Sequence, residues 1–384
     1  MIPYARQSIS DYDIKAVEDV LKSELLTQGP VVPSFEEAVS NFTGANYAVA
    51  VNSATSALHI ACLALGLGKD DLLWTSPNTF VASANCALYC GASVDFVDIN
   101  PNTWNMCADA LEKKLIEAKK RGHLPKIVVP VHLCGLSPDM SSIHKLSKEY
   151  GFFVIEDASH AIGAFYENSA VGSCRYSDIT VFSFHPVKII TSGEGGMALT
   201  NDKNLSTKMG LLRSHGITRD PDLMSFEMDG PWYYEQIALG FNYRLTDIHA
   251  ALGLSQFQRL DKFIKRRHEI ANKYDSLLAD IPVKSQECPE SCYSSFHLYV
   301  IRLQTEEIEK SHRQIFEELR SDILVNLHYI PVHYHPLYRK LGFKEGDFPE
   351  SELYYKQAIS IPCYPDLTDE QVNIVSDRLR KLIL

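Results

Sequence analysis

The fold is decided by the stretch FFVIEDASH, which occupies residues 152–160. A continuous apolar run, Phe152–Ile155, leads directly into the acidic pair Glu156-Asp157. Unbroken runs of this kind are typical of strands that are buried on both faces of a parallel sheet. Ligands of such sheets bind beyond the carboxyl ends of the strands. The stretch therefore predicts a parallel strand whose end carries carboxylates at a ligand site.

The same alternation of short apolar runs and helical stretches extends from about residue 13 to residue 200. It predicts an α/β fold with a mostly parallel sheet that is covered by helices on both faces. The predicted strands are Tyr47–Val51, Leu72–Thr75, Val94–Ile99, Ile127–Val131, Phe152–Ile155, Ile179–Phe184 and Gly196–Thr200, and the predicted helices include Ser53–Leu65, Ala108–Lys120 and Met140–Tyr150.

The C-terminal part of the chain has a different pattern, which predicts a smaller α+β unit. We expect an arm at residues 1–12, a large domain at 13–250 and a small domain at 251–384, because a chain of 384 residues is long enough for about two domains. The segment Thr246–Leu278, which leads into the small domain, is expected to be mostly helical. The other expected elements of this domain are a strand at Phe296–Leu303, a helix at Glu306–Arg320, a strand at Leu324–Tyr329 and a helix at Asp369–Leu384.

Composition and charge exclude several classes of protein. The net charge of −11 disfavours bulk binding of nucleic acid. Two charge-free stretches, Ala38–Gly68 and Leu72–Val94, are long enough to cross a bilayer, but polar residues interrupt both, which predicts buried strands and helices instead. Met1–Ser10 lacks the pattern of a signal peptide, and nine cysteines without a CxxC motif favour reduced thiols. We therefore expect a cytoplasmic protein that is not embedded in a membrane.

Four features at the predicted strand ends suggest a cofactor site. Lys188 lies between a strand and a glycine-rich turn, where partial burial would favour the neutral amine that Schiff-base chemistry needs. The small-residue turn at residues 52–56 precedes a helix and can hold an anion, although a plain helix cap explains it equally well. Phe80 can stack on a planar ring, and Asp157 can hold a protonated ring nitrogen, a ribose or a metal, or cap a helix. Together an anion cradle, a ring, a carboxylate and an amine are what pyridoxal 5′-phosphate (PLP) requires.

Other ligand classes have weaker support in the sequence. The GEGG stretch at residues 193–196 does not match GxGxxG, which argues against an NAD-dependent oxidoreductase. His328, His333 and His335 would make a metal site only with a further ligand, and no carboxylate or cysteine completes the set, although the last two would share a strand face. No metal is therefore expected. The close pair Cys86/Cys90 is expected to lie at adjacent turns of one helix, and Cys288/Cys292 is the other close pair.

The order of the motifs resembles that of the DegT/StrS sugar aminotransferases over nearly the whole chain. The motifs are NSATSAL (52–58), FVASAN (80–85), EDASHA (156–161), FSFHPVK (182–188), GEGG (193–196), RSHG (213–216) and NYRL (242–245). The resemblance implies the aspartate-aminotransferase-like fold of PLP-dependent transferases, known as fold type I. Some relatives are dehydratases that carry histidine in place of the lysine, so Lys188 favours amino transfer.

The resemblance also assigns roles to single residues. It implies that Lys188 binds the cofactor's aldehyde, that Asp157 pairs with the pyridine nitrogen and that His160 lies near the ring hydroxyl, as the three catalytic residues. Phe80 would stack on the ring. Asn242 would reach the site of a neighbouring subunit, which implies a homodimer with shared active sites. The residues implied to hold the phosphate are Ala54, Thr55 and Ser183.

Further motifs are similar to those of the family members that make a sugar for pseudaminic acid. They are LLTQG (25–29), SFHLY (295–299), VNLHYIPVH (325–333) and IPC (361–363). The similarity implies transfer of an amino group from L-glutamate to C4 of a UDP-linked 4-keto-6-deoxy-N-acetyl-L-hexose. Tyr334-His335 is a departure, because relatives more often carry Leu-Gln there. The implied substrate-binding residues are Tyr4, Glu24, Leu25, Leu26, Thr27, Ala54, Ser183, Asn242, Leu327, His328, Tyr329 and Ile330.

Three other functions stay open at this point. The same scaffold could aminate a D-configured UDP-sugar, as for a bacillosamine precursor, or a GDP-sugar, as for perosamine. It could also be a non-catalytic sensor that binds a sugar nucleotide. Retention of both Lys188 and Asp157 argues against the sensor.

Overall fold

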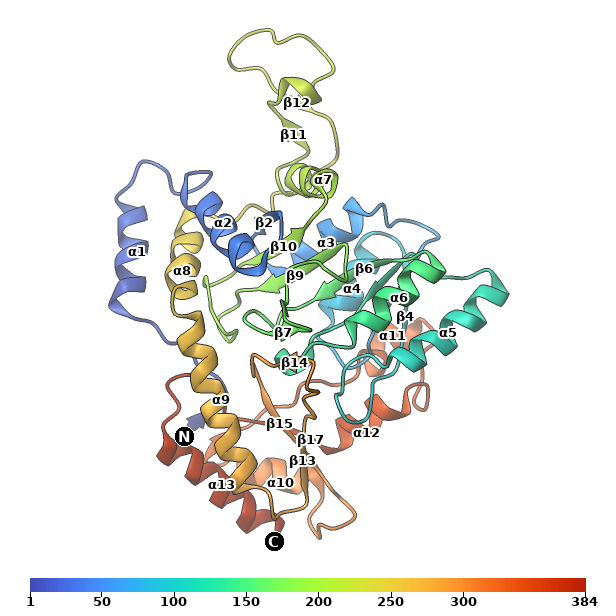
Figure 1. Ribbon diagram of the computed structural model, residues 1–384, viewed down its shortest axis with the longest axis vertical. Coiled ribbons are helices and arrows are strands. Elements are labelled where there is room, and N and C mark those ends of the chain that lie inside the picture. The colour runs from blue at the N-terminus through green and yellow to red at the C-terminus, as the bar shows by residue number, and fades with distance from the viewer.

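A seven-stranded sheet forms the centre of the protein, whose computed structural model describes residues 1–384 (Figure 1). The strand order is β2-β10-β9-β6-β5-β3-β4. Strand β10 is antiparallel to both of its neighbours, and the other pairs are parallel. The strands are β2 (Tyr47–Val51), β3 (Leu72–Thr75), β4 (Ser93–Phe96), β5 (Ile127–Val129), β6 (Phe153–Asp157), β9 (Ile179–Ser183) and β10 (Gly196–Thr200). The predicted α/β fold with a mostly parallel sheet is confirmed.

Both faces of this sheet are buried, as the unbroken apolar runs predict. Successive side chains of a strand point to opposite faces. In β5, Ile127 and Val129 therefore join one core cluster and Val128 joins another. The helices of the large sheet region are α2 (Val31–Thr43), α3 (Ala54–Ala64), α4 (Ala82–Tyr89), α5 (Ala108–Arg121), α6 (Met140–Tyr150) and α7 (Lys203–Arg213).

The C-terminal part packs around a second, three-stranded antiparallel sheet in the order β13-β15-β17. Its core cluster runs from Ile270 to Ile383 and includes one N-terminal residue, Ile2. Ile2 is reached because β1 (Ile2–Pro3) pairs in parallel with β16 (Ile323–Leu324). The division into an arm and two domains at residues 1–12, 13–250 and 251–384 stays a prediction. The elements of this part are α8 (Asp247–Phe257), α9 (Leu260–Leu277), β13 (Val283–Ser285), β15 (Tyr299–Leu303), α10 (His312–Leu319), α11 (Pro336–Lys340), α12 (Pro349–Gln357), β17 (Ala358–Ile361) and α13 (Asp369–Ile383).

Several smaller elements lie outside the two main sheets. A hairpin of β11 (Ile217–Thr218) and β12 (Glu235–Gln236) projects from one end of the molecule, at the top of Figure 1. Helix α1 (Asp11–Leu21) lies beside α8 on the outside (Figure 1). A small sheet combines β14 (Cys292–Tyr293), β7 (Phe165–Tyr166) and β8 (Ser169–Ala170), and short 3-10 helices cover Leu133–Gly135, Pro221–Leu223 and Val332–Tyr334.

Four predictions for the C-terminal part are wrong in extent or type. The strand predicted at Phe296–Leu303 begins only at Tyr299. The helix predicted from Glu306 begins only at His312, because Ser311 forms a capping box with Gln314. The strand predicted at Leu324–Tyr329 is reduced to β16. His333 and His335 do not share a strand face, because Val332–Tyr334 is a 3-10 helix between two prolines, which cannot donate to a ladder.

The two charge-free stretches form buried strands and helices of the large sheet region, namely parts of α2, β2 and α3, and β3 with α4. None of the helices combines the length and the apolar character that a bilayer span requires.

Candidate active site

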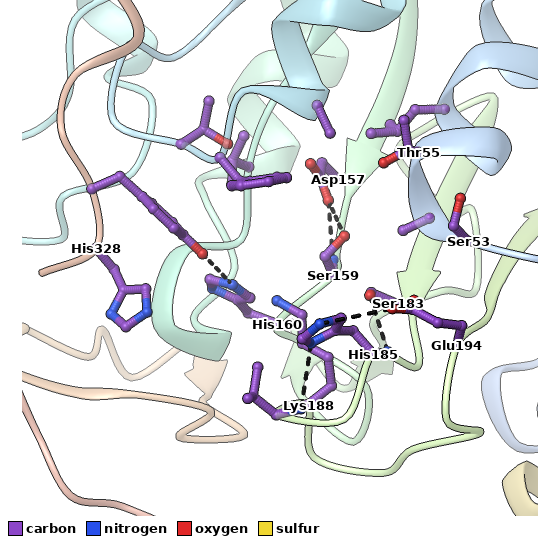
Figure 2. A pocket seen from close by; sticks show the side chains of 18 of the residues that line it. Ser53, Thr55, Asp157, Ser159, His160, Ser183, His185, Lys188, Glu194 and His328 are labelled. Carbon is purple, nitrogen blue, oxygen red and sulfur yellow. Dashed lines mark hydrogen bonds and ion pairs between the residues drawn. The ribbon is translucent and has the colours of Figure 1, made fainter. Parts of the chain in front are cut away.

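A pocket of about 290 Å³ opens at the carboxyl ends of the central strands. Its walls come from the segments that follow β2, β3, β6 and β9, together with the N-terminal arm and the loop after β16 (Figure 2). The residues that line it are Tyr4, Ser53, Ala54, Thr55, Leu58, Thr79, Phe80, Ala82, Val131, Asp157, Ser159, His160, Ser183, His185, Val187, Lys188, Glu194, His328 and Tyr329.

The N-terminus of α3 forms the anion-binding side of the pocket. Ser53 caps the helix and accepts a hydrogen bond from the amide of Ser56 at 3.1 Å. The amides of Ala54 and Thr55 have no partner within a helix that starts here, so they can bind an anion. Gly196 lets strand β10 approach this turn, since a Cβ there would lie 2.4 Å from the nitrogen of Ala54.

Asp157 ends strand β6 and is 5 % exposed. Its Oδ2 accepts a hydrogen bond from the Ser83 hydroxyl at 2.6 Å. Its Oδ1 accepts from the amide and the hydroxyl of Ser159, at 3.2 and 2.5 Å (Figure 2). An ionised carboxylate has about four acceptor positions. One position on Oδ2 therefore remains for a cationic N–H donor in the pocket.

Lys188 enters the same pocket from the turn after β9 (Figure 2). Its amide donates to the carbonyl of His185 at 2.9 Å, which fixes the backbone of the turn. Burial lowers the pKa of the Lys188 amine to about 8, although the Asp157 carboxylate acts in the opposite direction. A substantial share of the amine is therefore neutral near neutral pH, as nucleophilic chemistry requires.

His160 is held as a neutral ring between two partners. Its Nδ1 accepts a hydrogen bond from the amide of Cys134 at 3.2 Å. Burial, aided by the charge of Lys188, lowers the pKa of His160 well below its usual range, so the single ring proton lies on Nε2. Nε2 is 3.1 Å from the hydroxyl of Tyr329 and donates to it (Figure 2). The Tyr329 hydroxyl therefore keeps its own proton as a donor to a ligand.

Aromatic side chains form the remaining walls. Phe80 is 58 % exposed, and its ring centroid lies 6.1 Å from that of Tyr329, so an apolar face is open to the pocket. His328 is fixed by a hydrogen bond between its Nδ1 and the Ser360 hydroxyl at 2.8 Å. Burial lowers the pKa of His328 to about 3, so the ring is neutral. Tyr4 packs against it, with 5.5 Å between ring centroids.

The structure brings ten of the predicted site residues to this pocket and leaves seven outside it. Those at the pocket are Tyr4, Ala54, Thr55, Phe80, Asp157, His160, Ser183, Lys188, His328 and Tyr329. Those that do not line it are Glu24, Leu25, Leu26, Thr27, Asn242, Leu327 and Ile330.

The seven outlying residues fall into two groups. Leu327 and Ile330 flank the two pocket residues His328 and Tyr329 in the chain. The exposed segment Glu24–Thr27 lies beside the segment of Asn242, because Thr27 forms a β-bridge with Thr246.

Sequence reasoning missed two serines that hold Asp157. Ser159 could have been found, because a hydroxyl two residues after an aspartate commonly closes a local turn on its carboxylate. Ser83 gave no signal, since it lies 74 positions away in the chain and meets Asp157 only through the packing of α4.

The histidines of the rejected metal site have separate partners. His333 lies 3.0 Å from a carboxylate oxygen of Glu352, whereas His328 pairs with Ser360. The neighbouring Tyr334, part of the departure from relatives, packs against Tyr355 and Arg339 and does not line the pocket.

Four independent observations show that the pocket fits PLP. They are the free amides at the start of α3, the open acceptor position on Asp157, the amine of Lys188 with its lowered pKa, and the exposed face of Phe80. They match the phosphate, the ring nitrogen, the aldehyde and the flat ring of that cofactor.

Comparison with known proteins agrees with this fit. Residues 7–380 match the model of the DegT/DnrJ/EryC1/StrS aminotransferase family. The chain is 38 % identical over 385 residues to the UDP-4-amino-4,6-dideoxy-N-acetyl-beta-L-altrosamine transaminase of Campylobacter jejuni, covering 100 % of this chain and 98 % of that protein. It is 37 % identical to the spore coat polysaccharide biosynthesis protein SpsC of Bacillus subtilis, covering 100 % and 97 %.

Solved structures give the same result. The Helicobacter pylori aminotransferase PseC, described as involved in the biosynthesis of pseudaminic acid, superposes with a TM-score of 0.90 at 34 % identity, covering 99 % of this chain and 98 % of that one. The PLP form of a putative sugar aminotransferase from Streptococcus pneumoniae gives a TM-score of 0.88 at 28 % identity, with both chains fully covered. The expected fold type I is confirmed, and the chain belongs to the DegT/DnrJ/EryC1/StrS family of PLP-dependent aminotransferases.

Proposed function

We propose that this enzyme transfers an amino group from L-glutamate to C4 of a UDP-linked 4-keto-6-deoxy-N-acetyl-L-hexose. The product would be UDP-4-amino-4,6-dideoxy-N-acetyl-β-L-altrosamine, a precursor of pseudaminic acid. The activity of the C. jejuni relative and the pathway of the H. pylori aminotransferase support this choice over other nucleotide sugars.

The observation that carries the proposal is that Lys188 and Asp157 line the same pocket. PLP, when bound, supplies an electron sink for the carbon that carries the amino group. Asp157 would hold the ring nitrogen protonated through its open Oδ2 position, with Ser83 fixing the carboxylate. The turn of Ala54 and Thr55 would hold the phosphate, together with Ser183.

Lys188 would move the proton in both halves of the reaction. Its Nζ takes a proton from the carbon of glutamate that bears the amine, and in the second half it delivers one to C4 of the sugar. A general base is most effective when its pKa lies near the working pH, and burial brings the pKa of Lys188 to about 8. Tyr329 donates its hydroxyl proton to a bound oxygen, because His160 already occupies its acceptor side.

The active unit in this proposal is a homodimer with shared sites. Glu24–Thr27 and Asn242 lie outside the pocket of their own chain, and Thr27 forms a β-bridge with Thr246, four residues after Asn242. Leu25 and Leu26 are 51 % and 46 % exposed although both are apolar, which favours a surface that a second copy covers. These two segments would thus supply residues to the partner's pocket.

The test is incubation of the PLP-loaded enzyme with glutamate and the UDP-linked 4-keto-L-sugar, followed by NMR of the product. The proposal predicts a 4-amino-L-sugar and release of 2-oxoglutarate. Parallel reactions with the D-configured UDP-sugar and with the GDP-sugar decide between substrates. Bound PLP without turnover of any of the three would instead favour the sensor.

A further inference from the structure

A loop of the C-terminal part packs against the wall of the active site. It comprises residues 294–298 and leads into β15. The amide of Ser295 donates to the carbonyl of Gly135 at 3.0 Å, and the amide of Leu298 donates to the carbonyl of Cys134 at 3.3 Å. The loop is thus joined by its backbone to the segment that follows β5 of the large sheet.

Two side chains of this loop contact His160, one at its backbone and one at its ring. The hydroxyl of Ser295 donates to the carbonyl of His160 at 2.8 Å. The ring of His297 lies against the ring of His160, with 4.4 Å between the centroids and an angle of 51° between the planes. Gly135 permits this approach, because a Cβ there would lie 2.9 Å from the carbonyl oxygen of His160. His160 is therefore held by the loop as well as by its own strand segment.

The ring of His297 is buried and neutral. It is 2 % exposed, and its Nδ1 has no hydrogen-bond partner. A charged imidazole carries an N–H donor on each nitrogen, so the charged form would bury a donor without an acceptor. Burial lowers the pKa of His297 well below its usual range, and the neighbouring His160, Lys188, Arg267 and His328 act in the same direction. Two neutral rings can pack closely, whereas two charged rings would repel each other.

Arg267 of α9 fixes the loop from the side that faces the small sheet. Its guanidinium is buried, and its Nη1 donates to the carbonyls of Phe296, His297 and Cys363 at 3.0, 3.0 and 2.7 Å. Hydrogen bonds to a charged group are stronger than those between neutral groups. The loop therefore cannot shift without breaking the bonds of a buried cation, which makes it a firm support for the His160 ring.

We infer that His297 is a positioning residue, which packs on the His160 ring and keeps its Nε2–H directed at the hydroxyl of Tyr329. The His160 ring has one hydrogen bond at each nitrogen, to the amide of Cys134 and to Tyr329. Rotation of the ring would break both bonds, and the His297 ring packed against it opposes that rotation. With His160 in place, Tyr329 can donate its own proton to a bound oxygen. This last step rests on the proposed function, whereas the position of His160 does not.

Removal of the His297 ring would change the protonation of His160. A cavity in its place would admit water and weaken the effect of burial, so the pKa of His160 would rise towards the usual value of about 6.5. A charged His160 carries a proton on Nδ1, which would face the Cys134 amide, also a donor, so the ring would turn and release Tyr329. The titratable groups that face His160 from other elements are Lys188 after β9, His132 after β5, and His297, His328 and Tyr329 of the C-terminal part.

The first experiment follows the His160 ring by NMR of the PLP-loaded enzyme with ¹³C-labelled histidine, and the signal that His160→Gln removes is the one assigned. We expect no titration of His160 between about pH 5.5 and 8 in the wild type, and a midpoint at about 6–6.5 in His297→Ala. The matched control His123→Ala removes an exposed histidine and should leave the signal unchanged. A wild-type His160 that titrates in this range, or a His297→Ala variant in which it does not, would overturn the inference.

The second experiment is a double-mutant cycle on the single-turnover rate of 2-oxoglutarate formation from saturating glutamate at pH 6. His297→Ala should lower this rate roughly tenfold, which is the effect of one lost hydrogen bond. In the Tyr329→Phe background the same substitution should change the rate less than about twofold, because the hydroxyl that His160 orients is already absent. An equal loss in both backgrounds would show that His297 does not act through Tyr329.

Two further variants separate packing from folding. His297→Phe restores a neutral ring and should recover most of the rate lost in His297→Ala, whereas a phenylalanine variant as slow as the alanine variant would overturn the packing role. Ser295→Ala leaves both rings in place and removes the bond to the His160 carbonyl, so it should raise the same NMR midpoint by a smaller amount, and it decides the question if His297→Ala does not fold. Absence of turnover in the wild type would count against the proposed function and leave the NMR titration to decide the role of His297.

Discussion

At the scale of single residues, the site depends on one buried carboxylate that hydrogen bonds hold in place and one buried amine whose pKa is lowered. Three hydrogen bonds from Ser83 and Ser159 hold the carboxylate of Asp157 in place. Burial favours the neutral form of Lys188. The site thus offers a carboxylate for the ring nitrogen and a nucleophile for the aldehyde in the same pocket.

The pH dependence of cofactor binding should report the lowered pKa of Lys188. Below the pKa the amine is protonated and cannot attack an aldehyde, so the rate at which apoenzyme binds PLP should rise with pH and level off. The midpoint should lie near pH 8, against 10.5 for an ordinary lysine. The visible absorbance of the lysine-bound cofactor measures this rate, and Lys188→Ala should show no such absorbance. A midpoint near 10.5 would show that Lys188 is not desolvated.

Ser83→Ala should loosen the Asp157 carboxylate. The bond between the two side chains is buried and 2.6 Å long, and hydrogen bonds to charged groups contribute about 1.5–3 kcal/mol. We expect the free energy of unfolding to fall by about that amount and PLP to bind roughly tenfold more weakly. Urea unfolding and PLP titration measure the two effects. Ser206→Ala on α7, which lacks a side-chain hydrogen bond, is the matched control and should change neither.

The sequence identified the residues that act directly and missed those that position them. Lys188, Asp157 and Phe80 follow predicted strands, so their place at the sheet edge could be inferred from topology alone. Ser83 could not be inferred, because its contact with Asp157 depends on how α4 packs on the sheet. The proposed role of Asn242 likewise involves a second chain.

At the scale of elements, the site requires a close approach between strand β10 and the start of α3. Gly196 is the first residue of β10, and it faces the backbone of Ser53 and Ala54. The strands of this sheet could be predicted because unbroken apolar runs are typical of strands that are buried on both faces. The C-terminal elements were predicted poorly, because Ser311 and the prolines Pro331 and Pro336 set boundaries that periodicity does not show.

Gly196→Ala should damage the anion cradle. A Cβ at this position would lie 2.4 Å from the nitrogen of Ala54, so α3 or β10 must shift. We expect a loss of about 1–3 kcal/mol in the free energy of unfolding and weaker binding of PLP.

Gly210→Ala is the control for this substitution. Gly210 lies in α7 with no atom near the position of a Cβ, so alanine should stabilise the protein by about 0.5–1 kcal/mol. Thermal unfolding and PLP titration compare the two variants. Unchanged PLP affinity in Gly196→Ala would place the phosphate elsewhere.

At the scale of the whole molecule, the surface that carries Glu24–Thr27 and Asn242 is unexplained by one chain alone. The chain has a net charge of −11, yet the proposed substrate is a diphosphate nucleotide, so local groups must bind it against that background. A homodimer would bring a second set of such groups to each pocket.

Mixed dimers test whether the sites are shared. Lys188→Ala and Asn242→Ala should each lose most activity as pure proteins. Co-expressed in equal amounts, random pairing makes half of the dimers hybrid, each with one intact site, so activity should recover to about a quarter of the wild-type value. Recovery requires that Asn242 acts in the partner's pocket. If mass spectrometry shows hybrid dimers but activity does not recover, Asn242 acts in the pocket of its own chain.

The most direct test of the central claim is the C4 configuration and nitrogen content of the product from the UDP-linked 4-keto-L-sugar. With PLP and ¹⁵N-glutamate, we predict that NMR shows one ¹⁵N-amino group at C4 of UDP-4-amino-4,6-dideoxy-N-acetyl-β-L-altrosamine, and none with Lys188→Ala. Exclusive labelling of a D-configured or GDP-linked sugar would contradict the assigned substrate. Labelled product from Lys188→Ala at the wild-type rate would contradict the assigned mechanism.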